Sequence, residues 1–270
     1  MVVTLQPKRG ALYSIDRNNR MFAVFKLPCL LFTLLFMATT SATEPLKLYM
    51  PDAPPLTLHH YRGGHGMVGD VVLAALARTG RLTQIIAEPW PRAQARVTNS
   101  SNLLIIPLSR TPEREDQYTW VAPIMVLERA FFSLDEPVAS FSEARQRYRR
   151  IGVGMGTAQV AILQREGFGE EQIIQLKLGE NPARLLTLGR IDAWFTGVPE
   201  ALYIWEGSEH RRQPLRRSPV LASTDLYLGC SKTCDAQLVE QLRAAIAELE
   251  REGISQRLRE AYMPWQPAPY

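Results

Sequence analysis

The sequence lacks the motifs that mark several large classes of enzyme. It contains no H-E-x-x-H pair and no dense framework of cysteine and histidine, so a zinc enzyme has no basis in it. It contains no G-x-S-x-G turn, which removes the same basis for a serine hydrolase. Beyond residue 42, no apolar run approaches the roughly 20 residues that a transmembrane helix needs. The function must therefore be sought in other patterns.

Net charge is also scarce once the N-terminal segment is set aside. Residues 1–42 carry five basic residues and one acidic residue, a net charge of +4, and the whole chain also carries +4. The other residues are thus close to neutral, and the sequence pI of about 9.0 comes mostly from the N-terminal segment. A nucleic-acid-binding protein shows a basic patch or stripe, so we expect no nucleic-acid partner.

The N-terminal segment has the pattern of a secretory signal peptide. An apolar run from Leu27 to Met37 follows Lys26 and precedes several small residues. This run of about 11 residues is too short to cross a hydrocarbon core of about 30 Å. We expect residues 1–42 to be removed by cleavage after Ala42, with Met21 as an alternative start of the chain.

Cysteine and histidine are few in the exported part. Cys230 and Cys234 are its two cysteines, and in an oxidising compartment they can form a disulfide or stay free, because sequence does not give the Cβ geometry. The histidines at 59, 60 and 65 do not suggest a metal site, since adjacent histidines in an extended segment point to opposite faces. We expect no metal and no other cofactor.

Strands and helices alternate along residues 43–270, which predicts α/β layers. The expected strands lie at 46–50, 83–87, 103–106, 126–134, 151–155, 172–178, 191–195 and 225–229. The expected helices lie at 68–79, 91–98, 157–167, 182–188, 199–206, from 235 to Gly253, and at 254–262. The strand-helix-strand order favours a parallel sheet with right-handed crossovers. We predict two lobes with a crevice between them, a favoured place for a small-molecule site.

One short segment carries the most specific chemistry. Ser109 follows the expected strand 103–106 and is itself followed by Thr111 and Arg114 in T-x-x-R spacing. A guanidinium group binds a carboxylate through two parallel charge-assisted hydrogen bonds. This segment resembles the ligand-binding turn of the family-3 periplasmic solute-binding proteins, which include the lysine/arginine/ornithine- and histidine-binding proteins.

Other motifs extend the resemblance over most of the chain, from Leu46 to about Tyr262. Each is weak alone, but their order and spacing agree with the family. They are the Pro-Pro turn in 49–56, the G-x-x-x-D-like entry at 64–70, P-W-x-R-A at 89–93, the Gly-Thr turn in 151–157, G-R-x-D-A at 189–193, and the final Gly253 and Tyr262.

The resemblance implies a two-lobed periplasmic binding protein fold of type II, with a ligand crevice between the lobes. The first lobe would comprise residues 43–125 and 234–270, and the second lobe residues 126–233. It also implies a monomer in the periplasm that captures a small carboxylated ligand for the membrane permease of an ABC-type importer.

The resemblance also implies roles for single residues. Arg114 would hold the ligand carboxylate, unless it forms an ion pair with a neighbouring glutamate at 113, 115 or 128. Ser109 and Thr157 would form hydrogen bonds from opposite lobes. The amides that follow Gly156 would add donors at a helix N-terminus, which favours an anion. Trp90 is a candidate wall of the crevice, as are the aromatic residues at 49, 120 and 194.

One departure from the family concerns the ligand's charge. The family's amino-acid binders place an aspartate for the ligand ammonium group where this chain has Gly197. A buried ammonium without a carboxylate is costly. Either Asp52 or another acid supplies that charge, or the ligand is not an ordinary α-amino acid.

Two alternatives use the same fold. A periplasmic enzyme of the cyclohexadienyl dehydratase type would need a general acid in the crevice, with Glu88, Glu128 and Glu200 as candidates. A ligand-sensing module would use the same binding residues without transport.

Overall fold

The computed structural model describes residues 44–59 and 63–263. The predicted signal peptide and its cleavage site after Ala42 lie outside these residues, as does His60. Within the described ranges, no helix combines the length and the apolar character that crossing a membrane requires.

The strands form one mixed sheet of nine strands in the order β2-β1-β3-β9-β4-β7-β5-β6, with β8 paired to β4. Their bounds are β1 (Leu46–Tyr49), β2 (Thr83–Ile86), β3 (Leu104–Ser109), β4 (Tyr118–Ser133), β5 (Ile151–Gly154), β6 (Ile173–Leu176), β7 (Ala193–Gly197), β8 (Arg216–Arg217) and β9 (Ala222–Ser231). The predicted parallel pairing holds for β1 with β2 and β3, and for β5 with β6 and β7.

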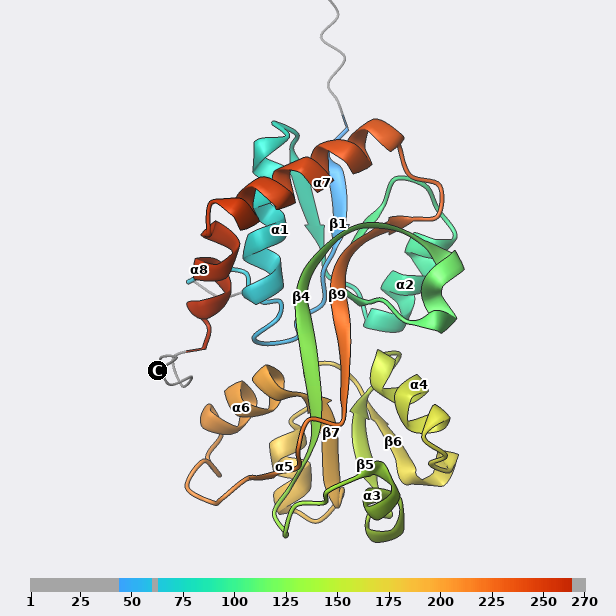
Figure 1. The fold of residues 1–270 in the computed structure, drawn as a ribbon, viewed down its shortest axis with the longest axis vertical. Helices are drawn as coiled ribbons and strands as arrows, with labels where there is room; N and C mark the ends of the chain where they lie inside the picture. The colour runs from blue at the N-terminus through green and yellow to red at the C-terminus, as the bar shows by residue number, and fades with distance from the viewer. Residues whose placement is uncertain (1–43, 60–62, 264–270) are drawn as a thin grey trace, which may run out of the picture. The chain divides into compact units, whose positions relative to one another are not determined.

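The expectation of a parallel sheet is wrong for the strands that join these two groups. β4 and β9 pair antiparallel along most of their lengths and lie side by side through both halves of the fold (Figure 1). The sequence pattern predicted only the second half of β4, because Pro123 interrupts it. Pro123 cannot donate a ladder hydrogen bond, and the register of β4 on β9 shifts on both sides of Ala122–Pro123.

In the described ranges eight α-helices cover the sheet; seven lie close to where the apolar spacing predicts them, whereas the helix at Phe141–Arg147 was not predicted. They are α1 (Met67–Arg78), α2 (Trp90–Thr98), α3 (Phe141–Arg147), α4 (Ala158–Arg165), α5 (Pro182–Thr187), α6 (Val198–Glu206), α7 (Ala236–Arg251) and α8 (Ile254–Glu260). Two 3-10 turns are also present, at Pro112–Gln117 and Glu170–Gln172. Asp235 begins α7 as expected, because its side chain accepts a hydrogen bond from the Leu238 amide.

The buried apolar side chains fall into separate cores. One core joins α1, α7 and β1 with the first half of β4, from Leu46 to Tyr262. Two others surround Phe131 and Trp194, and their members lie between residues 130 and 222. This separation is what a two-lobed fold requires, since each lobe must bury its own apolar face. The lobe boundaries at 125 and 233 stay a prediction.

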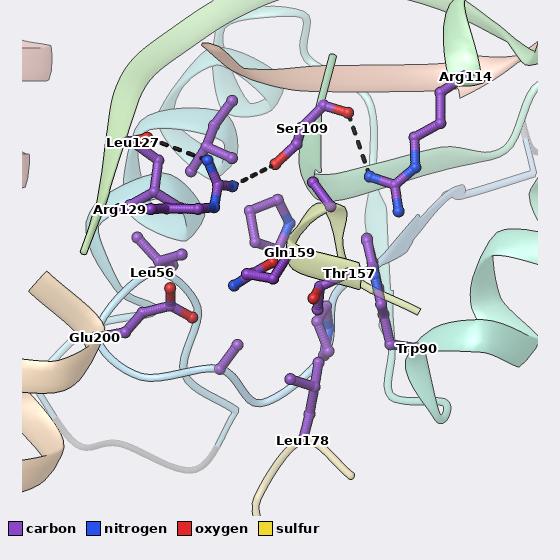
Figure 2. Close-up of a pocket in the computed structure, with 15 residues that line it drawn as sticks. Leu56, Trp90, Ser109, Arg114, Leu127, Arg129, Thr157, Gln159, Leu178 and Glu200 are labelled. Atoms are coloured by element: carbon purple, nitrogen blue, oxygen red, sulfur yellow. Dashed lines mark hydrogen bonds between the residues drawn. The ribbon is translucent and has the colours of Figure 1, made fainter. Parts of the chain in front are cut away.

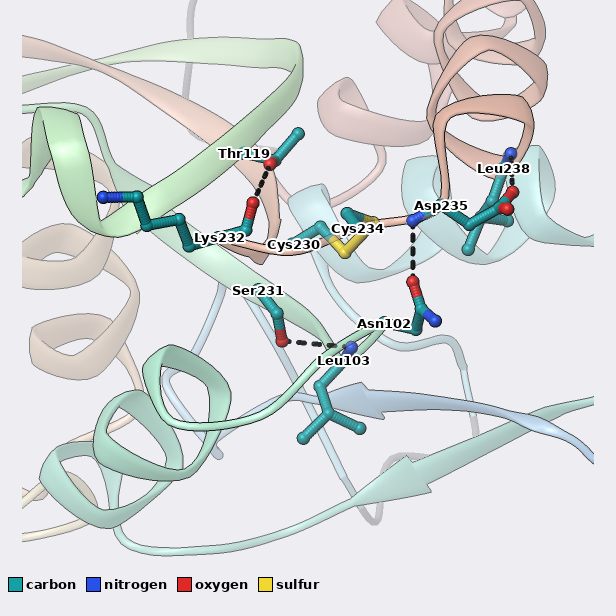
Figure 3. The surroundings of a disulfide bond; sticks show 9 residues. All are labelled: Asn102, Leu103, Thr119, Cys230, Ser231, Lys232, Cys234, Asp235 and Leu238. Carbon is teal, nitrogen blue, oxygen red and sulfur yellow. Dashed lines mark hydrogen bonds between the residues drawn. A yellow bond between two sulfur atoms is a disulfide. The ribbon is translucent and has the colours of Figure 1, made fainter.

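Cys230 and Cys234 are bonded to each other, which decides between the two possibilities that the sequence left open (Figure 3). The bond joins the end of β9 to the residue before Asp235 and α7. The Asp235 amide also donates to Asn102 Oδ1 at 2.7 Å. The disulfide therefore ties the start of α7 to the C-terminal end of β9, which is the end far from the second lobe.

Candidate functional site

A crevice lies between the two lobes, with a cavity of about 40 Å³ at its inner end. The cavity is lined from β3, β4, α2, α4 and α6, and Figure 2 shows the side chains that surround it. It adjoins a second hollow of about 60 Å³, with which it shares Thr157, Gln159 and Glu200. It also adjoins a wider hollow of about 690 Å³, with which it shares Trp90 and Leu178. The site thus has a narrow interior, where Arg114, Arg129 and Glu200 lie among apolar residues, and a wide, mostly apolar mouth.

Arg129 is the most deeply buried charge of the crevice, with 1% of its surface exposed. Its Nη1 donates to Leu127 O at 3.2 Å and to Thr224 Oγ1 at 2.8 Å, and its Nη2 donates to Ser109 Oγ at 2.9 Å. Its Nε is buried and has no hydrogen-bond partner within residues 44–59 and 63–263. Burial lowers the pKa of Arg129 to about 10, so the group is still charged at neutral pH.

Glu200 lies on the first turn of α6, beneath Arg129 in Figure 2. Its Oε2 accepts from the Gly197 amide at 3.1 Å and from Thr196 Oγ1 at 3.2 Å. Burial raises the pKa of the Glu200 carboxyl, while Arg129 and these two hydrogen bonds lower it. Among the described residues, Glu200 and Arg129 form no ion pair, although each influences the charge of the other.

Arg114 bridges the two lobes on the other side of the cavity. Its Nη2 donates to Gly156 O at 2.8 Å and to Gln94 Oε1 at 2.9 Å, and its Nη1 donates to Ser109 O at 3.3 Å. Gln94 Nε2 also donates to Gly156 O, at 3.0 Å. The ion-pair alternative for Arg114 is not what the structure shows, because its neighbouring acids pair with other arginines or face solvent. Burial lowers the pKa of Arg114.

Ser109, Thr157 and Gly156 lie together, as the motifs predict. Ser109 offers its hydroxyl to Arg129 and its carbonyl to Arg114. Thr157 begins α4 and donates to Gly154 O at 2.6 Å, so its oxygen is left to accept. Gly156 has φ +70°, which a residue with a side chain rarely adopts, and its carbonyl receives the Arg114 bridge. The first amides of α4 have no side-chain cap and stand at the cavity.

Trp90 and Asp52 mark the mouth of the crevice. Trp90 is buried and lines both the inner cavity and the wide hollow. Asp52 lines only the wide hollow, is exposed, and accepts a hydrogen bond from the His59 amide at 3.2 Å. The structure therefore does not bring Asp52 together with Arg114 and Ser109. Among the other aromatic candidates, Trp194 lines the smaller hollow, whereas Tyr49 belongs to a buried core.

The other acids named for a general-acid role lie elsewhere. Glu88 forms an ion pair with Arg96 at 3.1 Å and lines only the wide hollow. Glu128 is exposed on β4. His65 contacts the Leu58 carbonyl through Nδ1 at 3.2 Å, and no group of three metal-ligating side chains exists in the described ranges. Glu200 is the candidate that the crevice contains.

Sequence reasoning did not assign Arg129 or Gln159 to the site. Gln159 is buried, lines both inner hollows and makes no side-chain hydrogen bond to the described residues. The sequence did contain a signal for Arg129. An arginine directly before Ala130-Phe131-Phe132 in an apolar strand is unusual, since arginine is rarely buried without a partner, and it therefore indicates a functional position. Gln159 carried none, since a glutamine near the start of a helix is ordinary.

Solved structures share this fold. No family model matches the chain, and no curated protein matches it in sequence. The arginine-, lysine- and histidine-binding protein ArtJ from the thermophilic bacterium Geobacillus stearothermophilus aligns with a TM-score of 0.71 at 16% identity, over 83% of this chain and 97% of that chain. A histidine kinase sensor domain with similarity to periplasmic binding proteins aligns with a TM-score of 0.71 at 16% identity, over 82% and 96%.

A third similar structure is the ancestral amino acid-binding protein AncCDT-1, a precursor of cyclohexadienyl dehydratase. It aligns with a TM-score of 0.67 at 17% identity, over 81% of this chain and 94% of that chain. Identities this low establish the fold and not the ligand. The chain has the two-lobed α/β fold of the periplasmic binding proteins, with the crevice between its lobes, and the fold predicted from the sequence motifs is confirmed.

Proposed function

We propose that this protein is a periplasmic solute-binding protein of the amino-acid-importer type, which captures a small carboxylated ligand between its lobes. Arg114, Ser109, Thr157 and the amides after Gly156 would hold the carboxylate, and Trp90 would form a wall. Binding would favour the closed arrangement by its differential affinity for the two arrangements of the lobes. The closed protein would then present a surface to a membrane permease.

One observation carries the proposal: the inner crevice holds two guanidinium groups, Arg114 and Arg129, and neither pairs with a carboxylate among the described residues. A buried positive charge without a partner is unfavourable, so such a crevice favours an anion. A guanidinium fork binds a planar carboxylate through two parallel hydrogen bonds, as it also binds a phosphate. The disulfide between Cys230 and Cys234 supports an oxidising compartment such as the periplasm.

A thermal-shift screen tests the proposal. The purified protein is heated with amino acids, small organic acids and polyamines, and Arg114→Ala is measured beside it. A ligand present at about 100 times its dissociation constant stabilises the fold by about 2.7 kcal/mol, which is readily seen as a shift in Tm. We expect a carboxylated compound to raise Tm, and to raise it less in Arg114→Ala. Shifts from polyamines alone would contradict the proposal.

A second candidate function is an enzyme of the cyclohexadienyl dehydratase type, and Glu200 is the observation that favours it. Burial raises the pKa of this carboxyl inside the crevice, which is the property of a general acid. Such an acid would protonate a leaving hydroxyl while the ring carboxylate departs as carbon dioxide. Incubation with a carboxylated cyclohexadienol would then produce aromatic absorbance, and Glu200→Gln would abolish it. An unchanged absorbance in the wild-type protein would dismiss this candidate.

A further inference from the structure

We propose that Arg129 and Glu200 together recognise the ligand, with Arg129 joining Arg114 at its carboxylate and Glu200 binding an ammonium group of the same molecule. The inference rests on the proposed function and deepens it, because it identifies the ligand as a zwitterion of the α-amino acid class. Glu200 would supply the negative charge that Gly197 does not provide.

The first step is the strand register. Arg129 on β4 lies directly opposite Gly197 on β7 in the antiparallel pairing. Residues opposite each other in such a pair project their side chains to the same face, with Cβ atoms about 4.5–5.5 Å apart. An acid at position 197 would therefore stand beside Arg129 at the inner end of the crevice.

The second step is what occupies that place. A Cβ atom built on Gly197 would lie 2.4 Å from Glu200 Oε2 and 2.8 Å from Leu127 Cδ1. The backbone of Gly197 is extended, with φ −62° and ψ 138°, so its conformation does not require glycine. Position 197 requires glycine because the Glu200 carboxylate fills the space that a side chain would need. Glu200 thus places its carboxylate, from one helical turn further along the chain, where a side chain of residue 197 would be.

The third step concerns the groups left without partners. Nε of Arg129 is buried and has no partner among the residues that the structure describes, and Nη2 donates one hydrogen bond there, to Ser109 Oγ. Nε and Nη2 form one edge of the guanidinium, which is the edge a carboxylate can bind side-on. Both hydrogen bonds recorded for the Glu200 carboxylate are accepted by Oε2. A purely structural pair would bring these opposite charges into contact, and the described residues show no such contact.

The crevice also has room for the remainder of an amino acid. The inner cavity shares Trp90, Leu178 and Pro51 with the wide hollow of about 690 Å³. A head group held by Arg129 and Glu200 would direct its side chain along Trp90 toward this mouth. The mouth is lined mostly by apolar residues, and its charged lining residues are of both signs: Asp52, Glu88, Arg92 and Lys177.

The experiment measures the affinity of the purified protein for matched ligands by calorimetry. The twenty standard L-amino acids are screened, and the tightest binder is compared with its 2-hydroxy acid and with its decarboxylated amine. We expect each of these analogues to bind at least about 10-fold more weakly, because each leaves one buried charge unpaired. In Glu200→Gln we expect the amino acid and the 2-hydroxy acid to bind with similar affinity.

Two further variants separate recognition from folding. Gly197→Asp combined with Glu200→Ala returns a carboxylate to the same place, and we expect it to recover the preference for the amino acid. Glu206→Gln changes an exposed acid on the same helix and should leave the preference intact. A wild-type protein that binds the 2-hydroxy acid as tightly as the amino acid overturns the inference while the proposed function stands. Binding of no carboxylated probe overturns both.

Discussion

The two arginines of the crevice differ in what their hydrogen bonds are used for. Arg114 gives three hydrogen bonds to protein acceptors, and two of them join Gln94 and Gly156 across the lobes. Arg129 is more deeply buried, yet its Nε has no hydrogen-bond partner in the described part of the chain. We call the first region, comprising Arg114, Gln94 and Gly156, the lobe bridge. The second region, Arg129 and Glu200, is the charged end.

The two regions have different roles: the lobe bridge contributes to lobe closure, and the charged end contributes to ligand recognition. The lobe bridge is satisfied by the protein itself, so part of its energy holds the lobes together whatever lies in the crevice. The charged end contains a buried guanidinium, Arg129, and a half-buried carboxylate, Glu200, which form no ion pair in the described part of the chain. This costs stability until another group completes their hydrogen bonds. Functional sites commonly hold such stability losses, because the ligand then contributes the missing interactions.

The largest effect is expected at Arg129. Arg129→Gln removes the charge and one edge of donors, while its length lets it keep part of the contact with Ser109. Truncation of one member of a buried charged contact costs about 2–5 kcal/mol, so we expect the affinity for the ligand found in the screen to fall at least about 30-fold. Calorimetry of this variant against wild type measures the loss.

Arg217→Gln is the matched control, because Arg217 is exposed on β8, outside the crevice lining. We expect this variant to bind the ligand with wild-type affinity. Circular dichroism establishes that Arg129→Gln is folded. If folded Arg129→Gln kept wild-type affinity, the distinction between the two regions would be lost, and Arg114 would be the sole carboxylate contact.

A smaller loss is expected at Arg114. Arg114→Gln removes three hydrogen bonds to protein and weakens any contact with the carboxylate, but it leaves the charged end in place. We expect an affinity loss of about 10-fold, equivalent to about 1.4 kcal/mol. A loss larger than that of Arg129→Gln, measured with the same ligand, would reverse the assignment of the two regions.

The lobe bridge was more predictable from sequence than the charged end. Arg114, Ser109 and Gly156 lie in short motifs at strand ends, where local spacing fixes which groups meet. Arg129 and Gly197 meet only through the register of β4 on β7, which depends on a long strand that Pro123 concealed. No local pattern encodes that pairing.

The place of Glu200 beside Arg129 was likewise not predictable from local sequence patterns. The motif comparison marked Gly197 as lacking a carboxylate but did not place Glu200 in the gap. Glutamate three residues after a helix start is common as a cap, and Glu200 does cap the Gly197 amide. That Glu200 also lies near Arg129 on β4 depends on the tertiary fold, which no local sequence pattern gives. The overall fold was predictable because amphipathic spacing and turn residues repeat along the whole chain.

The stability of the charged end should depend on pH. Burial raises the pKa of Glu200, and Arg129 is the charged group that opposes this rise, while Lys177 and Glu180 line the adjoining hollow. A carboxyl whose pKa is raised in the folded state binds more protons there than in the unfolded state. The free energy of unfolding therefore falls as pH rises from the unfolded-state pKa through the folded-state pKa. We expect Glu200→Gln to raise Tm, with a gain that grows over this range and then levels off.

Melting curves of both proteins between about pH 4 and pH 8 measure that gain, without ligand. Each kcal/mol corresponds to roughly 2–4 °C in a chain of this size. Glu206→Gln should show no such trend, since its carboxylate is exposed. A gain that is constant with pH would mean that the substitution acts through packing, and that the pKa of Glu200 is the same in the folded and the unfolded protein.

The smallest effect is expected from the lobe bridge when Arg114 is kept. Gln94→Ala removes one hydrogen bond to Gly156 O and the acceptor of one Arg114 hydrogen bond. A hydrogen bond contributes about 0.5–1.5 kcal/mol, so we expect an affinity loss of roughly 2- to 10-fold for every ligand alike. Because the charged end is untouched, the ratio of affinities for an amino acid and its 2-hydroxy acid should not change. A changed ratio would show that lobe closure and ligand recognition are coupled, and that Gln94 helps to set the position of the ligand's charged groups.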